Sequence, residues 1–98
     1  MPLKPQWDEE VDVLVEEDIL SDTPSRIIVF NDDHNSFEWV IQCFMEILQH
    51  SSEQAEQLSL IIHFKGKATV KTGPKDELRP QYEALLDRGL SAVLDDGD

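Results

Sequence analysis

The chain has 98 residues, which is enough for one small domain with a tail and too few for a two-domain dinucleotide-binding fold, a barrel enzyme or a kinase. The 21 acidic residues outnumber the eight basic ones and leave a formal net charge of -13, which argues against nucleic acid and anionic membranes as partners. Hydrophobic residues make up 40% of the chain, which suffices for a small core, and no apolar run is long enough to span a membrane. The single Cys43 excludes an internal disulfide. The first residues do not resemble a signal peptide, so we expect a soluble, cytoplasmic protein.

Residues 1–24 are the most acidic part of the chain and contain three of its five prolines. This composition is typical of a flexible arm. Val11, Val13 and Val15 alternate as in a short strand, so a strand added to a sheet edge stays an alternative. We therefore predict an acidic N-terminal arm at 1–24, a folded domain at 25–94 and a frayed acidic tail at 95–98.

The folded part begins with a predicted strand and a predicted helix. Arg26–Phe30 is β-branched and aromatic, which is typical of a strand. Asn35 stands three residues before Glu38, the spacing of a capping box, so we expect Asn35 to cap the next helix. Apolar residues then recur at helical spacing and predict one buried face, made of Phe37, Val40, Ile41, Phe44 and Leu48. Cys43 lies among these neighbours, which predicts an inert core thiol.

A second helix and a second strand follow. Ser51 and Gln54 repeat the capping spacing, and Gly66 is a natural residue to end the helix. The buried face of this helix should contain Ala55, Leu58 and Ile62. The segment 67–72 alternates polar and apolar residues, which predicts a strand with one solvated face shared by Lys67 and Lys71.

A third helix and a last strand complete the predicted domain. We expect the helix to start between Glu77 and Pro80, because proline is harmless in a first turn, and to end near Arg88 with Gly89 after it. Its inward residues should be Leu78, Tyr82, Leu85 and Leu86. The segment 90–94 reads as a short strand. The order β-α-α-β-α-β predicts an α+β fold, a two-layer sandwich with helices on one face of a three-stranded antiparallel sheet.

Two segments could carry function. Residues 31–36 read Asn-Asp-Asp-His-Asn-Ser and connect a strand directly to an apolar helix, which suits either a turn with a cap or a binding loop. His63 ends a largely apolar run at a helix C-terminus, where it could serve the helix dipole or bind a ligand. Lys65, Lys67, Lys71 and Lys75 are close in sequence and could either keep a strand soluble or dock an acidic partner.

Other chemistry finds little support. Asp32, Asp33, His34 and His63 are possible metal ligands, but their spacing matches neither a zinc-protease motif nor a calcium loop. The chain has no glycine-rich phosphate loop and no nucleophile elbow. We predict no metal, no cofactor and no catalytic residue, and keep a small metal-dependent enzyme on Asp32, Asp33 and His63 as a minor alternative.

Taken together, Asn31-Asp32-Asp33 and, about 30 residues later, His63-Phe64-Lys65-Gly66-Lys67-Ala68 resemble the signature of the ClpS adaptor family. The resemblance covers residues 25–94 and implies a fold similar to the C-terminal domain of the ribosomal stalk protein. It also implies an adaptor rather than an enzyme. Such adaptors bind substrates whose free N-terminal residue is Leu, Phe, Tyr or Trp. They deliver these substrates to a Clp-type AAA+ unfoldase through its N-terminal domain.

The resemblance also implies roles for residues that match the family positions. Asn31, Asp32 and His63 would bind the substrate α-amine, a cation that needs converging acceptors. Asp33 and Asn35 would bind the substrate backbone. The hydrophobic pocket would be formed by Phe37, Val40, Ser59, Ile62 and Leu90. Binding should weaken below about pH 6, because a protonated His63 loses its acceptor and repels the amine.

The chain departs from the family pattern at three places. Phe37 and Ser59 stand where methionine is common, so the preferred N-terminal residue could differ. The third helix is about six residues shorter than in longer members, which puts partner contact through residues 76–82 in doubt. These departures motivate the alternative of a ClpS-like protein–protein interaction module without degron binding.

Overall fold

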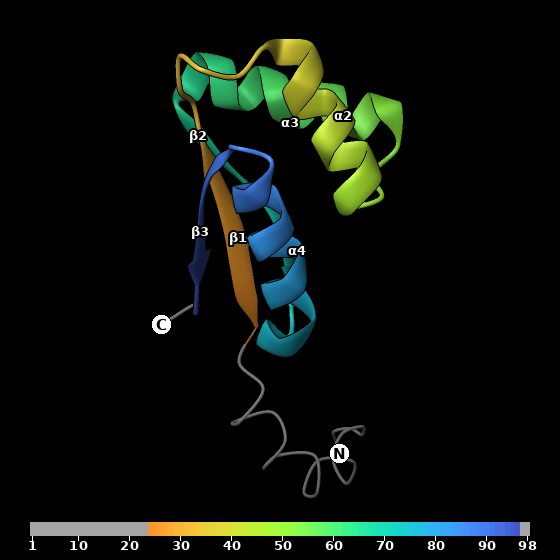
Figure 1. Ribbon diagram of the computed structural model, residues 1–98, viewed down its shortest axis with the longest axis vertical. Helices are drawn as coiled ribbons and strands as arrows, with labels where there is room; N and C mark the ends of the chain where they lie inside the picture. Colours follow the sequence, from red (N-terminus) through yellow and green to blue (C-terminus); the bar gives the residue numbers. More distant parts are fainter. Residues whose placement is uncertain (1–23, 97–98) are drawn as a thin grey trace, which may run out of the picture.

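The computed structural model describes residues 24–96, and these form one layer of helices against one sheet (Figure 1). The elements in chain order are β1 (Ser25–Phe30), α2 (Phe37–Ile47), α3 (Ser52–Lys65), β2 (Lys67–Gly73), α4 (Lys75–Asp87) and β3 (Ser91–Asp95). This confirms the predicted order. The predicted acidic arm, apart from Pro24, and the possible strand at residues 11–15 lie outside the described residues. None of the helices between residues 24 and 96 is long and apolar enough to cross a membrane.

The sheet has β1 in its centre, with β2 on one side and β3 on the other, and both pairs are antiparallel. The predicted α+β fold with a three-stranded antiparallel sheet is therefore confirmed. Ile27 and Val29 of β1 are buried, whereas Arg26 before them and Phe30 after them are exposed and Ile28 between them is half-buried. This alternation arises because successive side chains of a strand point to opposite faces. Helix α4 packs against all three strands and covers the inner face (Figure 1).

A bulge in β2 corrects one prediction about the lysines. Ile27 pairs with Lys71 and the next residue, Ile28, pairs with Thr69, so Val70 is an extra residue in β2. Lys67 pairs with the exposed Phe30, whereas Lys71 pairs with the buried Ile27. Lys67 and Lys71 therefore lie on opposite faces of the sheet, and the prediction that they share a face is wrong. The bulge reverses the alternation that the sequence suggests.

The core fills the space between the sheet and the helices. Its fully buried apolar residues come from every element or the turn beside it: Ile27, Val29, Cys43, Phe44, Leu48, Ala55, Ile62, Val70, Leu78, Leu85 and Leu90. The predicted core thiol Cys43 is confirmed, with burial raising the pKa of this thiol against the opposing effect of the Arg88 guanidinium. Leu86, in contrast, is 42% exposed, so its predicted inward position is wrong.

The residue that caps the N-terminus of α2 differs from the prediction. The hydroxyl of Ser36, and not the side chain of Asn35, accepts a hydrogen bond from the Trp39 amide at 3.1 Å and caps the helix. The expected capping box of Asn35 and Glu38 is therefore wrong, because the side-chain amide of Asn35 is hydrogen-bonded to other partners. Ser51 caps α3 as predicted, accepting from the Gln54 amide at 3.1 Å.

The start of α4 also differs from the prediction. This helix begins at Lys75, before the predicted start, and holds Pro80 in its interior. Pro74 is its N-cap, and the Pro74 carbonyl accepts hydrogen bonds from the amides of Glu77 and Leu78. Pro80 costs the helix one backbone hydrogen bond. The early start places Leu78, which is 2% exposed, in the core, and this burial offsets the cost.

Candidate functional site

The two sequence motifs meet where β1 ends and β2 begins. Phe30 pairs with Lys67, and the Asn31 amide donates a 2.9 Å hydrogen bond to the Gly66 carbonyl. Gly66 has a φ of 96°, a conformation that glycine adopts freely, and it turns the chain from α3 directly into β2. The end of α3, which carries His63, is thereby fixed beside the Asn31–Ser36 loop.

Asp32 organises this loop. Its Oδ1 accepts hydrogen bonds from the amides of His34 and Asn35 at 2.9 and 3.0 Å, and both carboxylate oxygens accept from the Asn35 side chain. The Ser91 hydroxyl donates to Oδ2 at 3.0 Å. Partial burial alone would raise the pKa of the Asp32 carboxyl, but these hydrogen bonds outweigh it and hold the pKa below its ordinary value of 3.8. Asp32 is therefore ionised, and its carboxylate stabilises the shape of the loop.

The loop is also tied to the turn between α4 and β3. Asn35 Nδ2 donates to the Gly89 carbonyl at 2.9 Å, and Trp39 Nε1 donates to the Arg88 carbonyl at 3.1 Å. With the bond from Ser91 to Asp32, these contacts join residues 49 to 59 positions apart in the sequence. Sequence reasoning missed Arg88, Gly89 and Ser91 as supports of the site, because two of these contacts use backbone carbonyls that carry no sequence signal.

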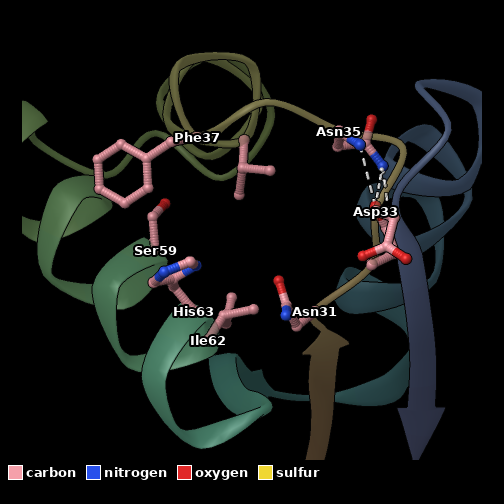
Figure 2. A pocket seen from close by; sticks show the side chains of 9 residues that line it. Asn31, Asp33, Asn35, Phe37, Ser59, Ile62 and His63 are labelled. Carbon is pink, nitrogen blue, oxygen red and sulfur yellow. Dashed lines mark hydrogen bonds between the residues drawn. The ribbon is translucent and has the colours of Figure 1, made fainter.

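A cavity of about 270 Å³ opens between the loop, the first turns of α2 and the last turns of α3 (Figure 2). It is lined by Asn31, Asp32, Asp33, Asn35, Phe37, Val40, Ser59, Ile62 and His63. Figure 2 shows Phe37 and Ser59 on one side, with Asn35 and Asp33 on the other. The structure thus brings together nine of the ten predicted site residues.

Leu90 is the tenth predicted residue, and it does not line this cavity. It is 4% exposed and borders a smaller adjoining hollow of about 30 Å³. Asn31, Val40 and Ile62 are among the residues that border both spaces. Leu90 therefore packs behind the cavity and supports its wall.

Several polar groups around the cavity have no hydrogen-bond partner in the part of the chain that the structure describes. Within the described residues, the side chains of Asn31, Asp33 and His63 make no hydrogen bond, although the His63 ring packs edge-on against Phe64 at 4.9 Å. The Asn31 side chain points towards the open space (Figure 2). Beside these groups lie the half-buried Phe37 and Val40 and the buried Ile62. Such a cavity can hold a cation attached to an apolar group.

Metal binding finds no support in the geometry. Between residues 24 and 96, no three side chains of His, Cys, Asp or Glu are placed so that they could hold one metal ion. The two carboxylates and the histidine of the minor metal-enzyme alternative all border the cavity but do not converge into a ligand group.

Comparison with known proteins identifies the family. The family described as "ATP-dependent Clp protease adaptor protein ClpS" matches residues 21–92. The chain belongs to the ClpS family. It is 36% identical over 67 residues to the ClpS adapter protein of Thermosynechococcus vestitus, covering 67% of this chain and 71% of that protein. It is 30% identical over 94 residues to ClpS of Rhodococcus opacus, covering 96% of this chain and 84% of that protein.

A further ClpS relative and one solved structure agree with this assignment. ClpS of Corynebacterium diphtheriae is 32% identical over 93 residues, covering 95% of this chain and 80% of that protein. The structure of Agrobacterium tumefaciens ClpS2 bound to L-phenylalaninamide is similar with a TM-score of 0.64 at 15% identity, covering 76% of this chain and 96% of that one. The structural likeness shows a shared ClpS fold.

Proposed function

We propose that this ClpS family member is an adaptor and not an enzyme. It binds the free α-amine and large hydrophobic side chain of an N-degron in the cytoplasm and delivers the substrate to a Clp-type AAA+ unfoldase for proteolysis. The observation that carries this proposal is the cavity in which the side chains of Asn31 and His63, which have no hydrogen-bond partner among residues 24–96, border an apolar wall. The family name and the ClpS2 complex with L-phenylalaninamide support it.

The polar end of the cavity suits an α-ammonium group. This cation has three N–H donors and needs several acceptors at one place. The Asn31 amide oxygen and a nitrogen of neutral His63 border the cavity and supply two of them. Asp33 adds an exposed carboxylate at the rim that is available to the substrate backbone.

Asp32 and Asn35 contribute in a different way in this proposal. A carboxylate offers about four acceptor sites, and five hydrogen bonds from within the protein already reach Asp32. Asp32 therefore supplies negative charge to the amine while it holds the loop in shape. The Asn35 amide nitrogen is used by Asp32 and Gly89, which leaves the Asn35 side-chain oxygen for the substrate backbone.

The apolar part of the cavity suits one large side chain. Drug-sized ligands occupy pockets of roughly 300–1,000 Å³, so about 270 Å³ fits a single residue such as Leu, Phe, Tyr or Trp. Burying a Leu or Phe side chain against Phe37, Val40 and Ile62 contributes roughly 1.5–3 kcal/mol. Leu90 supports this wall from behind.

The alternative function is a protein–protein interaction module of the ClpS fold without degron binding. It predicts that Phe37 collapses over Asn31 and His63 and closes the space between them. In the structure these three side chains border an open cavity, which favours the adaptor that binds degrons.

Titration with short peptides tests the proposal. Peptides that begin with Leu or Phe and carry a free amine should bind, and the same peptides with an acetylated N-terminus should bind at least tenfold more weakly, because an amide has neither the charge nor the three donors. Equal affinity for the acetylated peptide would exclude recognition of the amine.

A further inference from the structure

Ser59 places an unpaired hydroxyl in the wall of the cavity. It is 3% exposed, and its Oγ has no hydrogen-bond partner among the described residues. Serines within helices commonly bond to a carbonyl of the preceding turn, but Ser59 does not. Figure 2 shows its hydroxyl beside the Phe37 ring at the edge of the open space. The oxygen has almost no exposed surface, so a side chain that fills the cavity reaches it after a rotation of Ser59 or a small shift of the lining.

An unpaired buried hydroxyl is unusual and costs free energy, because most buried polar groups in proteins have a partner. The apolar cavity residues near it on α2 and α3 are Phe37, Val40 and Ile62, and none of these side chains can donate to Ser59 or accept from it. His63, on the same face of α3, also borders the cavity, but it makes no hydrogen bond with Ser59 Oγ. A bound side chain that carries its own hydroxyl could satisfy this group, whereas a hydrocarbon side chain would leave it unpaired.

The position of Ser59 on α3 fits the far end of such a side chain. Ser59 precedes His63 by four residues, so the two lie on the same face of the helix about 6 Å apart along its axis. A substrate with its amine at Asn31 and His63 therefore extends its side chain along α3 towards Ser59 and Phe37. Among the large hydrophobic residues, tyrosine carries its polar group at the end of the ring, farthest from the backbone.

We propose that Ser59 is a specificity-determining residue that favours tyrosine over phenylalanine at the substrate N-terminus, through a hydrogen bond between the phenol hydroxyl and Ser59 Oγ. This inference rests on the proposed function and deepens it. A site built to bond a hydroxyl discriminates against the analogue that lacks one, because the polar group of the site is then left unpaired. We expect a Tyr/Phe affinity ratio of about fivefold to a hundredfold, the range for an unsatisfied buried group.

The experiment measures the affinities of two peptides that differ only in having Tyr or Phe at the first position. It uses the full chain, the variant Ser59→Ala and the control variant Ser51→Ala, which changes a serine at the other end of the same helix. The full chain and Ser51→Ala should both prefer Tyr. Ser59→Ala should lose this preference and favour Phe, because a phenol buried without a partner loses its hydrogen bonds to water.

The outcomes separate the inference from the proposed function. If both free-amine peptides bind the full chain equally well and their acetylated forms do not, the specificity role of Ser59 is overturned and amine recognition stands. If neither free-amine peptide binds, both proposals are overturned. A Tyr preference that survives in Ser59→Ala would also overturn the inference, and thermal unfolding of each variant confirms that it is folded.

Discussion

The two segments that form the cavity differ in whether their polar side chains are hydrogen-bonded within the protein. In the loop, Asp32, Asn35 and Ser36 are all hydrogen-bonded within the protein. At the end of α3, Ser59 and His63 border the same cavity, and neither side chain has a hydrogen-bond partner within residues 24–96. Polar residues are common on both segments, but those bonded within the loop maintain its shape, and those left open on the helix are available to a ligand.

Asn31 and Asp33 are exceptions to this contrast, and Asn31 is the more informative of the two. Asn31 belongs to the loop; its backbone amide donates to the Gly66 carbonyl, but its side chain has no hydrogen-bond partner among residues 24–96. Its side chain faces the cavity in the way that Ser59 and His63 do. The contrast therefore separates individual side chains and not only segments, and substitutions can test it.

The largest effect is expected for Asp32→Ala. Removal of this carboxylate leaves the amides of His34 and Asn35 and the Ser91 hydroxyl without their acceptor. Hydrogen bonds to a charged group contribute about 1.5–3 kcal/mol each when well shielded, and partial exposure of Asp32 reduces this. We expect a lower unfolding free energy by about 1–2 kcal/mol and a loss of peptide binding of tenfold or more, measured by denaturant unfolding and by titration.

The pH dependence of stability provides the control for Asp32→Ala. Because the pKa of Asp32 in the folded state lies below its ordinary value of 3.8, the charged carboxylate stabilises the fold above that pH. This contribution disappears as the pH falls through the lowered pKa. The stability difference between the unmodified chain and Asp32→Ala should therefore shrink as the pH is lowered below 3.8. A difference that stays constant down to low pH would contradict the structural role of the charge.

A smaller and more selective effect is expected for Asn31→Ala and His63→Ala. Neither side chain is hydrogen-bonded in the described part of the protein, so the unfolding free energy should change by less than about 0.5 kcal/mol. Affinity for a free-amine peptide should fall by about 1–3 kcal/mol, the scale of a lost charged hydrogen bond. Calorimetric titration and thermal unfolding measure the two quantities separately. A large loss of stability would mean that these side chains are structural.

The smallest effect on binding is expected for Ser36→Ala, which removes the cap of α2. The loss of a serine cap costs about 1 kcal/mol of stability, while the cavity-lining residues are unchanged. Ser51→Ala removes the equivalent cap of α3 and serves as the matched control. Both variants should lose similar stability and keep their peptide affinity. A specific loss of affinity in Ser36→Ala would show that the loop side of the cavity depends on this cap.

The sequence predicted the elements because each carries its own local signal. The apolar periodicity before Leu48 and the serine at position 51 indicate two helices, and Gly66 marks the abrupt turn into β2. The resemblance to the ClpS family pointed to ten site residues, and nine of them line one cavity. These predictions depend on contacts between residues close in sequence, or on a pattern that a whole family shares.

The tertiary structure decided what depends on distant partners. Ser36 caps α2 in place of Asn35, because the side-chain amide of Asn35 donates to the carbonyl of Gly89 and the carboxylate of Asp32. Lys71 changed face because β2 bulges against β1, and α4 started early because Leu78 finds a place in the core. The sequence by itself determined which residues surround the cavity. Only the folded protein decided which polar groups among them are already bonded, because each hydrogen bond requires a partner that the fold brings from elsewhere in the chain.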